Sequence, residues 1–440
     1  MQEIKRGDIV SRNSYSHDII FSVKKVIKLA NKKQIAILKG IDVRVEADAP
    51  VEDLKIVSKE EQKKREKELE ERLCVRPTSE TIICTMYAKW LHSYRDLPFK
   101  YNQWANVVRW EKTTRPFLRG SEFLWQEGHT VHASEQEARE ETMRMLDIYE
   151  TTARELLAIP MVTGRKTERE KFAGAVETYT IEALMHDGKA LQSGTSHYFG
   201  DGFAKAFDMK FLDKDNKQKY VHQTSWGVST RLLGAIIMVH GDDNGLVLPP
   251  RVAPTQLMII PIQQHKEGIL DKAYELEATL KAAGIRVKVD ASDKSPGWKF
   301  SEAEMRGIPL RLEVGPRDLE NNMVTIVRRD TLEKVNVSVD EVVDYIEKLL
   351  PTIQNDMYNR ALERRNTMIY ETDSYEEFKE IASTKPGFIL SNWCGKTECE
   401  NKVKDETGLK SRCIKEDVEE GICPFCGEKA KHKLYFGRQY

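Results

Sequence analysis

The sequence has few cysteines, no long apolar run and almost no net charge. Its 440 residues contain seven cysteines, which is too few for a disulfide-stapled scaffold. No apolar stretch approaches the roughly 18 residues that a membrane span requires, and the start, MQEIKRGDIV, lacks the apolar core of a secretory signal. We therefore expect a cytoplasmic protein. Because the formal net charge is −1, any contact with nucleic acid must come from local basic patches.

The length is sufficient for several domains, and the charged fraction of 32% predicts well-solvated surfaces. Short strands, charged stretches, prolines and cysteines divide the chain into five segments. These are a small β-barrel-like module (1–57, with strands at 8–10, 19–26, 34–38 and 43–47), a charged helical linker (58–72), a mixed block (73–253), a strand–helix block (254–350) and a cysteine-rich block (351–440). The expected class is a multidomain protein of α+β and α/β type.

Apolar patterns predict the elements inside the two central blocks. In the mixed block we expect helices at 87–95 and 135–157 and strands at 106–110 and 235–240. In the strand–helix block, strands at 257–262, 287–290, 310–314 and 324–329 and a helix at 266–283 predict a compact α/β domain. Ser338 and Glu341 have the spacing of a capping box before a long helix.

Five of the seven cysteines lie in the last fifty residues. Four of them form two short-spaced pairs, Cys394 with Cys399 and Cys423 with Cys426. This spacing predicts a structural zinc site of four thiolates, and a redox pair at 423–426 is the alternative. Cys413 lies between the pairs as a spare, and we expect Cys74 and Cys84 to pack as small apolar residues.

The segment VVRWEKTTRPFLRGSEFLWQEG (107–128) predicts two strands joined by a basic loop. An arginine fork holds phosphate oxygens at two points, so the cations at 109, 112, 115 and 119 suit a polyphosphate. Phe123 could stack on a base, and Glu111 could accept a hydrogen bond from an exocyclic amine. From these residues alone, ordinary surface ion pairs on a hairpin remain the alternative.

This hairpin resembles motif 2 of a class II aminoacyl-tRNA synthetase. Further phrases resemble the prolyl-tRNA synthetases of the archaeal and eukaryotic-like type: VRPTSE (75–80), YNQW (101–104), FLWQEGHT (123–130), GRKTEREKFAGA (164–175), ALQSGTSH (190–197), QTSWGVSTR (223–231) and HGDDNGLVLPPRVAP (240–254). The resemblance runs from about residue 73 to residue 440. It implies a class II antiparallel-sheet catalytic core and a ligase that activates L-proline with ATP and Mg²⁺ and transfers it to tRNA(Pro).

The resemblance also implies the site residues. ATP would be bound by Arg109, Glu111, Arg119, Phe123, Gln192, Thr195, Ser229 and Arg231. Proline would be enclosed by Thr78, Glu80, Arg109 and His197. Arg109, Glu111 and Arg231 would be catalytic, with Arg109 on the α-phosphate and Arg119 on the γ-phosphate. From the residues alone, Thr78 and Glu80 fit a helix N-terminus, which is compatible with a role in binding.

The strand–helix block resembles a class IIa anticodon-binding domain through GWKFSEAEMRGIPLRLEVGPRDLE (297–320). Its local cations are Lys299, Arg306, Arg311 and Arg317, and we consider Glu304 and Arg317 as candidates for contacts with anticodon bases. The cysteine-rich block is expected to be an α/β zinc-binding domain. Its last residue, Tyr440 in LYFGRQY, is implied to dock near the active site.

Two features depart from the family pattern. Gly120 stands where the family usually has threonine, and motif 1, which precedes VRPTSE and forms the family's dimer interface, is absent. Residues 7–57 instead resemble the amino-terminal part of a spore-coat-processing peptidase, without its catalytic residues. A homodimer is the family expectation, but the missing motif 1 leaves dimerisation and full activity open. The alternative is a non-catalytic RNA-binding or regulatory paralogue.

Overall fold

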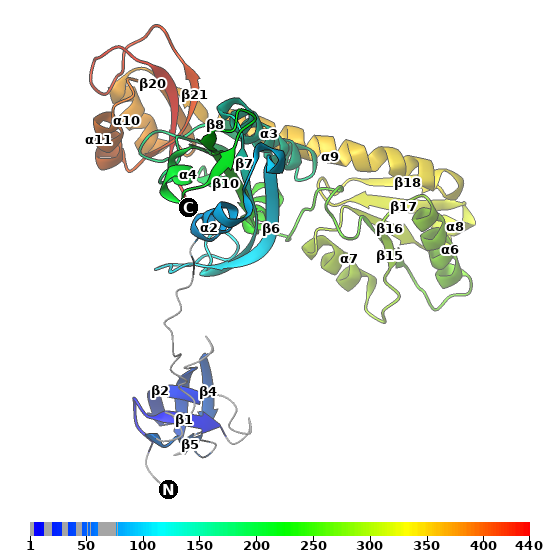
Figure 1. The fold of residues 1–440 in the computed structure, drawn as a ribbon. Helices are drawn as coiled ribbons and strands as arrows, with labels where there is room; N and C mark the ends of the chain where they lie inside the picture. The colour runs from blue at the N-terminus through cyan, green and yellow to red at the C-terminus, as the bar shows by residue number, and fades with distance from the viewer. Residues whose placement is uncertain are drawn as a thin grey trace. The chain divides into compact units, whose positions relative to one another are not determined.

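The computed structural model describes residues 4–12, 20–28, 34–40, 46–50, 52, 54–59, 76 and 78–440. The chain forms two compact units, Met1–Val75 and Arg76–Tyr440, and each is described by itself (Figure 1). Most of the predicted linker at 58–72, together with Cys74, lies outside the described residues. In the part of the chain that is described, no helix is both long and apolar enough to cross a bilayer.

The first unit is an antiparallel five-stranded sheet in the order β4-β3-β2-β1-β5. Its strands are β1 (Ile9–Arg12), β2 (Ile20–Lys28), β3 (Gln34–Gly40), β4 (Glu46–Pro50) and β5 (Leu54–Ile56). Val10, Phe21 and Leu38 are fully buried in its core. The structure confirms the first three predicted strands with small shifts. Most of the fourth, predicted at 43–47, lies outside the described residues, and β4 begins at Glu46. The structure also adds β5, whose three residues are too few for a periodic signal. Closure into a barrel stays a prediction.

The second unit is built on a ten-stranded sheet in the order β19-β20-β22-β21-β8-β9-β10-β13-β7-β6. The strands of the mixed block are β6 (Phe99–Val108), β7 (Glu122–His132), β8 (Val162–Arg165), β9 (Glu177–Leu184), β10 (Ala190–Gly200) and β13 (His222–Ser229). The strands of the cysteine-rich block are β19 (Ile369–Glu371), β20 (Phe388–Trp393), β21 (Lys410–Asp417) and β22 (His432–Gly437). One sheet therefore joins two blocks that the sequence presents as separate.

Helices and a small hairpin surround this sheet. They are α2 (Glu80–Trp90), η3 (Tyr94–Asp96), α3 (Glu135–Glu155), α4 (Gly202–Ala206), α5 (Arg231–His240), α10 (Tyr375–Thr384), α11 (Thr397–Thr407), and the paired strands β11 (Lys210–Leu212) and β12 (Gln218–Tyr220). Helix α3 covers β7, β9, β10 and β13. The strand that the sequence predicted at 235–240 is wrong, because these residues belong to α5. The apolar run is continuous there, so periodicity could not separate a strand from a buried helix.

The strand–helix block forms a five-stranded sheet in the order β15-β14-β16-β17-β18. Its elements are β14 (Leu257–Pro261), α6 (Ile269–Ala282), β15 (Val287–Val289), α7 (Pro296–Met305), β16 (Leu310–Val314), α8 (Pro316–Glu320), β17 (Met323–Arg328), β18 (Lys334–Ser338), η4 (Val339–Glu341) and α9 (Val342–Thr367). Helix α9 contacts both β18 and α5 and so links this block to the large sheet (Figure 1). The predicted capping box is wrong, because Ser338 caps the short η4 and no side chain caps α9.

Candidate active site

Two adjoining cavities open on the central strands of the large sheet. The first has a volume of about 240 Å³ and the second about 140 Å³. Residues from β7, β10 and β13 line both, and Arg109, which follows β6, lies between them. The shared lining residues are Arg109, Trp125, Gln192, Thr195 and Gly227. A ligand in one cavity would thus be within reach of a ligand in the other.

The first cavity combines two buried carboxylates, those of Glu80 and Glu127, with aromatic walls. Glu80 begins α2 and is 7% exposed, and the Thr78 hydroxyl donates a hydrogen bond to it. His197 lies 2.9 Å from the Thr178 hydroxyl and packs against the ring of Phe172. The structure therefore brings Thr78, Glu80 and His197 together, as the sequence predicted. A buried anion among rings suits a small cation that carries an apolar ring.

Glu127 is a further lining residue that the sequence analysis missed. The hydroxyl of Ser79 and the amide of Gln103 donate hydrogen bonds to its carboxylate, and His129 Nε2 lies 3.2 Å from it. Burial alone would raise the pKa of Glu127, but these partners hold the pKa below its ordinary value. The signal was present in FLWQEGHT, because Phe123, Trp125 and Glu127 alternate along β7 and therefore share one face.

The second cavity is lined by Arg109, Phe123, Ser229 and Arg231. Arg231 begins α5, and its guanidinium donates hydrogen bonds of 3.0 Å to the carbonyl oxygens of Leu118 and Gln192. Burial lowers the pKa of Arg231, and the nearby charges of Arg109 and Arg119 lower it further. The Arg109 guanidinium lies 5.4 Å from the centre of the Phe123 ring. Three guanidinium groups thus share one region, which suits a polyanion.

Glu111 and Arg119 lie outside the lining of both cavities. They form an ion pair with each other at 3.0 Å, on the loop between β6 and β7. Gly120 follows them, and a Cβ atom at this position would lie 2.9 Å from the carbonyl oxygen of Glu122. A larger residue at position 120 would therefore require the backbone of this chain to shift near Glu122.

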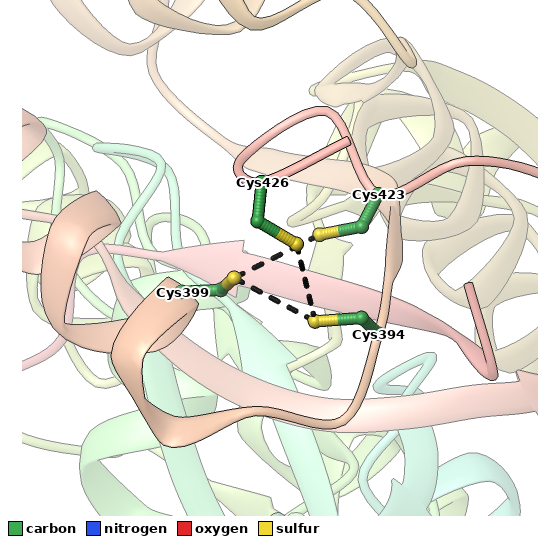
Figure 2. A group of neighbouring side chains, drawn as sticks. All are labelled: Cys394, Cys399, Cys423 and Cys426. Atoms are coloured by element: carbon green, nitrogen blue, oxygen red, sulfur yellow. Dashed lines mark hydrogen bonds between the residues drawn. The ribbon is translucent and has the colours of Figure 1, made fainter. Parts of the chain in front are cut away.

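The four paired cysteines converge into one cluster (Figure 2). The Sγ atoms of Cys394, Cys399, Cys423 and Cys426 all lie within 4.8 Å of one another, and three contacts measure 3.6, 3.6 and 3.9 Å. A tetrahedron with Zn–S bonds of about 2.3 Å has S···S edges of about 3.8 Å. The donor set therefore fits a four-thiolate metal centre better than a single redox pair. Cys413 is buried apart from this group.

The carboxyl terminus packs onto the catalytic core. Backbone hydrogen bonds join Arg438 and Tyr440 to Ala190, at the start of β10. The Tyr440 hydroxyl donates a 2.6 Å hydrogen bond to Asp187, and the Arg115 guanidinium lies 5.3 Å from its ring. The last residue thus contacts the loop that also carries Glu111 and Arg119, which agrees with the docking that the resemblance implied.

Two buried histidines, His132 and His197, and the half-buried His240 predict acid sensitivity. Burial lowers the pKa of His197 to about 3 and the pKa values of His132 and His240 to about 4. Above the unfolded pKa of about 6.5, such a histidine is neutral in both the folded and the unfolded chain. Below that pH only the unfolded chain gains a proton, so the free energy of unfolding falls by about 1.4 kcal/mol per pH unit for each histidine. We expect thermal melts to show lower stability at pH 5 than at pH 7. In His197→Gln this difference should shrink, and an unchanged difference would contradict the assignment.

Comparisons with known proteins agree with this geometry. Residues 63–240 match the tRNA synthetase class II core domain (G, H, P, S and T), residues 256–349 an anticodon binding domain, and residues 375–440 the prolyl-tRNA synthetase C-terminal domain. Residues 5–90 match the YabG peptidase U57 family, in line with the second resemblance.

Individual relatives match most of the chain. The proline--tRNA ligase of Lachnospira eligens is 62% identical over 84% of this chain and 78% of its own length, and that of Clostridium novyi is 61% identical over the same shares. A crystal structure of prolyl-tRNA synthetase from Cryptosporidium parvum, complexed with L-proline and AMP, is 43% identical with a TM-score of 0.82, and covers 85% of this chain and 79% of that one. By fold, site and sequence, the chain belongs to the class II prolyl-tRNA synthetase family.

Proposed function

We propose that the chain is a proline–tRNA ligase, which activates L-proline with ATP and transfers it to the 3′ end of tRNA(Pro). The observation that carries this proposal is the position of Arg109 between two cavities. One cavity holds a buried carboxylate among aromatic rings, and the other holds arginines. An amino acid with a cationic nitrogen and a polyphosphate could thus both contact the guanidinium of Arg109.

Activation requires positioning and positive charge rather than a protein nucleophile. The carboxylate of proline attacks the α-phosphorus of ATP, the bond to the β-phosphate oxygen breaks, and pyrophosphate leaves. Arg109 and Arg231 would stabilise the negative charge that develops on the α-phosphate. Arg119 would bind the γ-phosphate, Phe123 would stack on adenine, and Glu111 would accept a hydrogen bond from its amine. Ser229, Gln192 and Thr195 would complete the nucleotide contacts.

Proline would bind in the first cavity. Its secondary ammonium would pair with Glu80, which Thr78 orients through the hydrogen bond between them. Because His197 is neutral near pH 7, it can contact the pyrrolidine ring without repelling this cation. The carboxylate of proline would then face Arg109, which lines both cavities.

Two metal ions belong to this proposal. Mg²⁺ prefers oxygen ligands, and the side-chain oxygens of Gln192 and Thr195, which line both cavities, would hold it together with phosphate oxygens. Bound there, it would neutralise phosphate charge. Zn²⁺ would occupy the four-cysteine cluster in a structural role, because four thiolates leave no open coordination position.

A separate cavity of about 280 Å³ in the strand–helix block is proposed to receive an anticodon base. Trp298 on α7 is 47% exposed beside it, with the Lys294 ammonium 5.3 Å from its ring. The earlier candidate Glu304 instead forms an ion pair with the buried Arg311 at 2.8 Å. Neither Glu304 nor Arg317 lines this cavity.

Trp298→Ala is expected to weaken binding of tRNA(Pro), because stacking on an aromatic ring contributes about 1–3 kcal/mol per base. The KM for tRNA in aminoacylation should rise by about tenfold or more, whereas proline-dependent pyrophosphate exchange should stay unchanged. Trp298→Phe keeps a ring and serves as the matched control. Equal tRNA affinity in the wild type and Trp298→Ala would show that the base binds elsewhere.

A second copy of the chain is the proposed partner for an exposed apolar surface. Trp104 on β6 and Leu124 on β7 lie on one face of these paired strands and are 81% and 60% exposed. Burial of such side chains favours association. Sedimentation velocity measures the dimer directly, and a Trp104→Asp variant should shift it to monomer.

The alternative function rests on the sequence before VRPTSE, which lacks the motif 1 pattern of the family. A non-catalytic paralogue would bind tRNA(Pro) without activating proline. Exchange of labelled pyrophosphate into ATP by the purified 440-residue chain separates the two functions. Exchange that depends on added proline supports the ligase, and tRNA binding without exchange supports the paralogue.

A further inference from the structure

A buried ion cluster connects the cysteine-rich block to the catalytic core. Glu182 on β9 accepts hydrogen bonds from Lys166 Nζ at 2.6 Å and from an Arg412 guanidinium nitrogen at 2.7 Å. The three side chains are 0%, 2% and 1% exposed, respectively. Burial alone would raise the pKa of Glu182, but the two cations hold it below its ordinary value, so the carboxylate is charged. Neither Lys166 nor Arg412 lines the two cavities.

This cluster lies next to Gln192, which lines both cavities. In the register of the sheet Glu182 pairs with Gln192, and β10 has a bulge between Gln192 and Gly194. The carbonyl oxygen of Gln192 accepts the hydrogen bond from Arg231. The hydroxyl of Thr180 lies 3.2 Å from Glu182 and 3.3 Å from the carbonyl oxygen of Gly194, and so connects Glu182 to one side of the bulge.

A second set of polar contacts involves the residues next to Lys166 and Arg412 in the sequence. Glu400 accepts hydrogen bonds from the hydroxyls of Thr167 and Ser411, which are the sequence neighbours of Lys166 and Arg412. Glu400 follows Cys399 on α11, so the same helix carries a member of the cysteine cluster. The helix that carries Cys399 is thus hydrogen-bonded to the residues next to both cations of the ion cluster.

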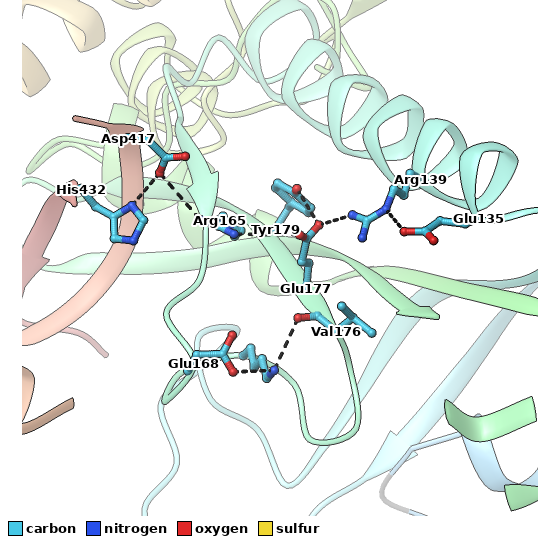
Figure 3. A network of polar contacts seen from close by, with 10 residues as sticks. Glu135, Arg139, Arg165, Glu168, Val176, Glu177, Tyr179, Asp417 and His432 are labelled. Atoms are coloured by element: carbon cyan, nitrogen blue, oxygen red, sulfur yellow. Dashed lines mark hydrogen bonds and ion pairs between the residues drawn. The ribbon is translucent and has the colours of Figure 1, made fainter. Parts of the chain in front are cut away.

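Ion pairs that are more exposed than the ion cluster join the three strands β8, β9 and β21 (Figure 3). Arg165 on β8 lies 3.7 Å from Asp417 on β21 and 3.9 Å from Glu177 on β9. Arg165 is 36% exposed. The Arg165–Asp417 pair joins β8 to β21, whereas Arg412 joins β21 to β9, and the partners of Arg165 do not include Glu182. It therefore provides a matched control.

Stability alone is a weak reason for a buried ion cluster, because desolvation offsets much of the attraction between its charges. We propose that Lys166 and Arg412 are positioning residues for ATP. Acting through Glu182, they hold the β10 bulge so that Gln192 and Arg231 keep their places in the nucleotide cavity. The cysteine-rich block thereby sets the affinity for nucleotide. This inference rests on the proposed ligase function.

The test replaces Arg412 with methionine, which leaves the Lys166–Glu182 pair intact and charge-balanced. In proline-dependent pyrophosphate exchange the KM for ATP should rise about tenfold, a size typical of coupling through a packed network. The KM for proline should stay within about twofold, since Glu80 and His197 lie in the other cavity. Arg412→Lys should recover most of the ATP affinity, and Arg165→Met should leave both KM values unchanged.

A merely structural Arg412 would give a different pattern. The active fraction and the melting temperature would then fall while both KM values stayed at wild-type levels, and this result would overturn the inference. Calorimetric titration with AMPPNP and with proline repeats the comparison without turnover. If the wild type binds both ligands and Arg412→Met binds AMPPNP equally well, only this inference fails. If the wild type binds neither ligand, the proposed function fails and this inference falls with it.

Discussion

Replacing Arg109 with alanine is expected to lower kcat for proline-dependent pyrophosphate exchange by about 10²–10³-fold, the loss that follows removal of one preorganised donor to a developing charge. Arg109 lines both cavities, so its loss removes positive charge at the point where the proline carboxylate would meet the α-phosphate. Partial desolvation lowers the pKa of Arg109, and the nearby carboxylates of Glu111, Glu80 and Glu127 oppose this shift. Stopped or quenched exchange assays over a range of ATP and proline concentrations separate kcat from KM.

Two control variants accompany Arg109→Ala: one removes another cation from the same loop, and one is a conservative change at position 109 itself. Lys112→Ala removes an exposed cation from the loop and should change exchange by less than about twofold, as is usual for surface substitutions. Arg109→Lys keeps the charge but loses the two-point fork, so it should recover only part of the activity. Exchange by Arg109→Ala at more than a fifth of the wild-type rate would be incompatible with the proposed role.

Removal of metal from the four-cysteine cluster is expected to have the largest effect on stability. A structural zinc contributes about 10–16 kcal/mol of binding free energy in small domains at pH 7. Cys394, Cys399 and Cys423 are buried in the core of this block, so Cys399→Ser should lower the melting temperature by about 10 °C or more. Elemental analysis should find one zinc per chain in the wild type and less in the variant.

Cys413→Ala is the matched control for the metal centre, because Cys413 is a buried thiol of the same block that does not belong to the cluster. It should keep its zinc and lose only the modest stability of a small core truncation. A chelator should destabilise the wild type and this control equally. A chain without zinc whose melting temperature is indifferent to chelator would exclude the structural metal.

The candidate site was predictable where its residues lie close together in the sequence. The loop after β6 and the phrase around Glu80 place their side chains by local geometry, and a resemblance could identify them. Glu127 was missed because its strand carries several other polar residues and nothing next to it marks this carboxylate as the one that lines a cavity, although its alternation with Phe123 and Trp125 gave the signal. The four-cysteine cluster was predictable because two short spacings restrict the geometry.

The sequence did not predict the contacts between distant parts of the chain. Arg412 and Glu182 lie 230 residues apart, and no local pattern in either segment indicates that β21 pairs with β8. The cysteine-rich block therefore looked like a separate domain, whereas its strands extend the catalytic sheet. Helix α5 was misread as a strand because packing buries Ala235, Ile236 and Val239 inside a continuous apolar run.

A crystal structure of the chain with AMPPNP and L-proline tests the central claim most directly. The account predicts phosphate oxygens within hydrogen-bond distance of Arg109 and Arg231, and the proline ammonium against Glu80. A nucleotide bound away from these arginines, or a proline that does not reach Glu80, would contradict it.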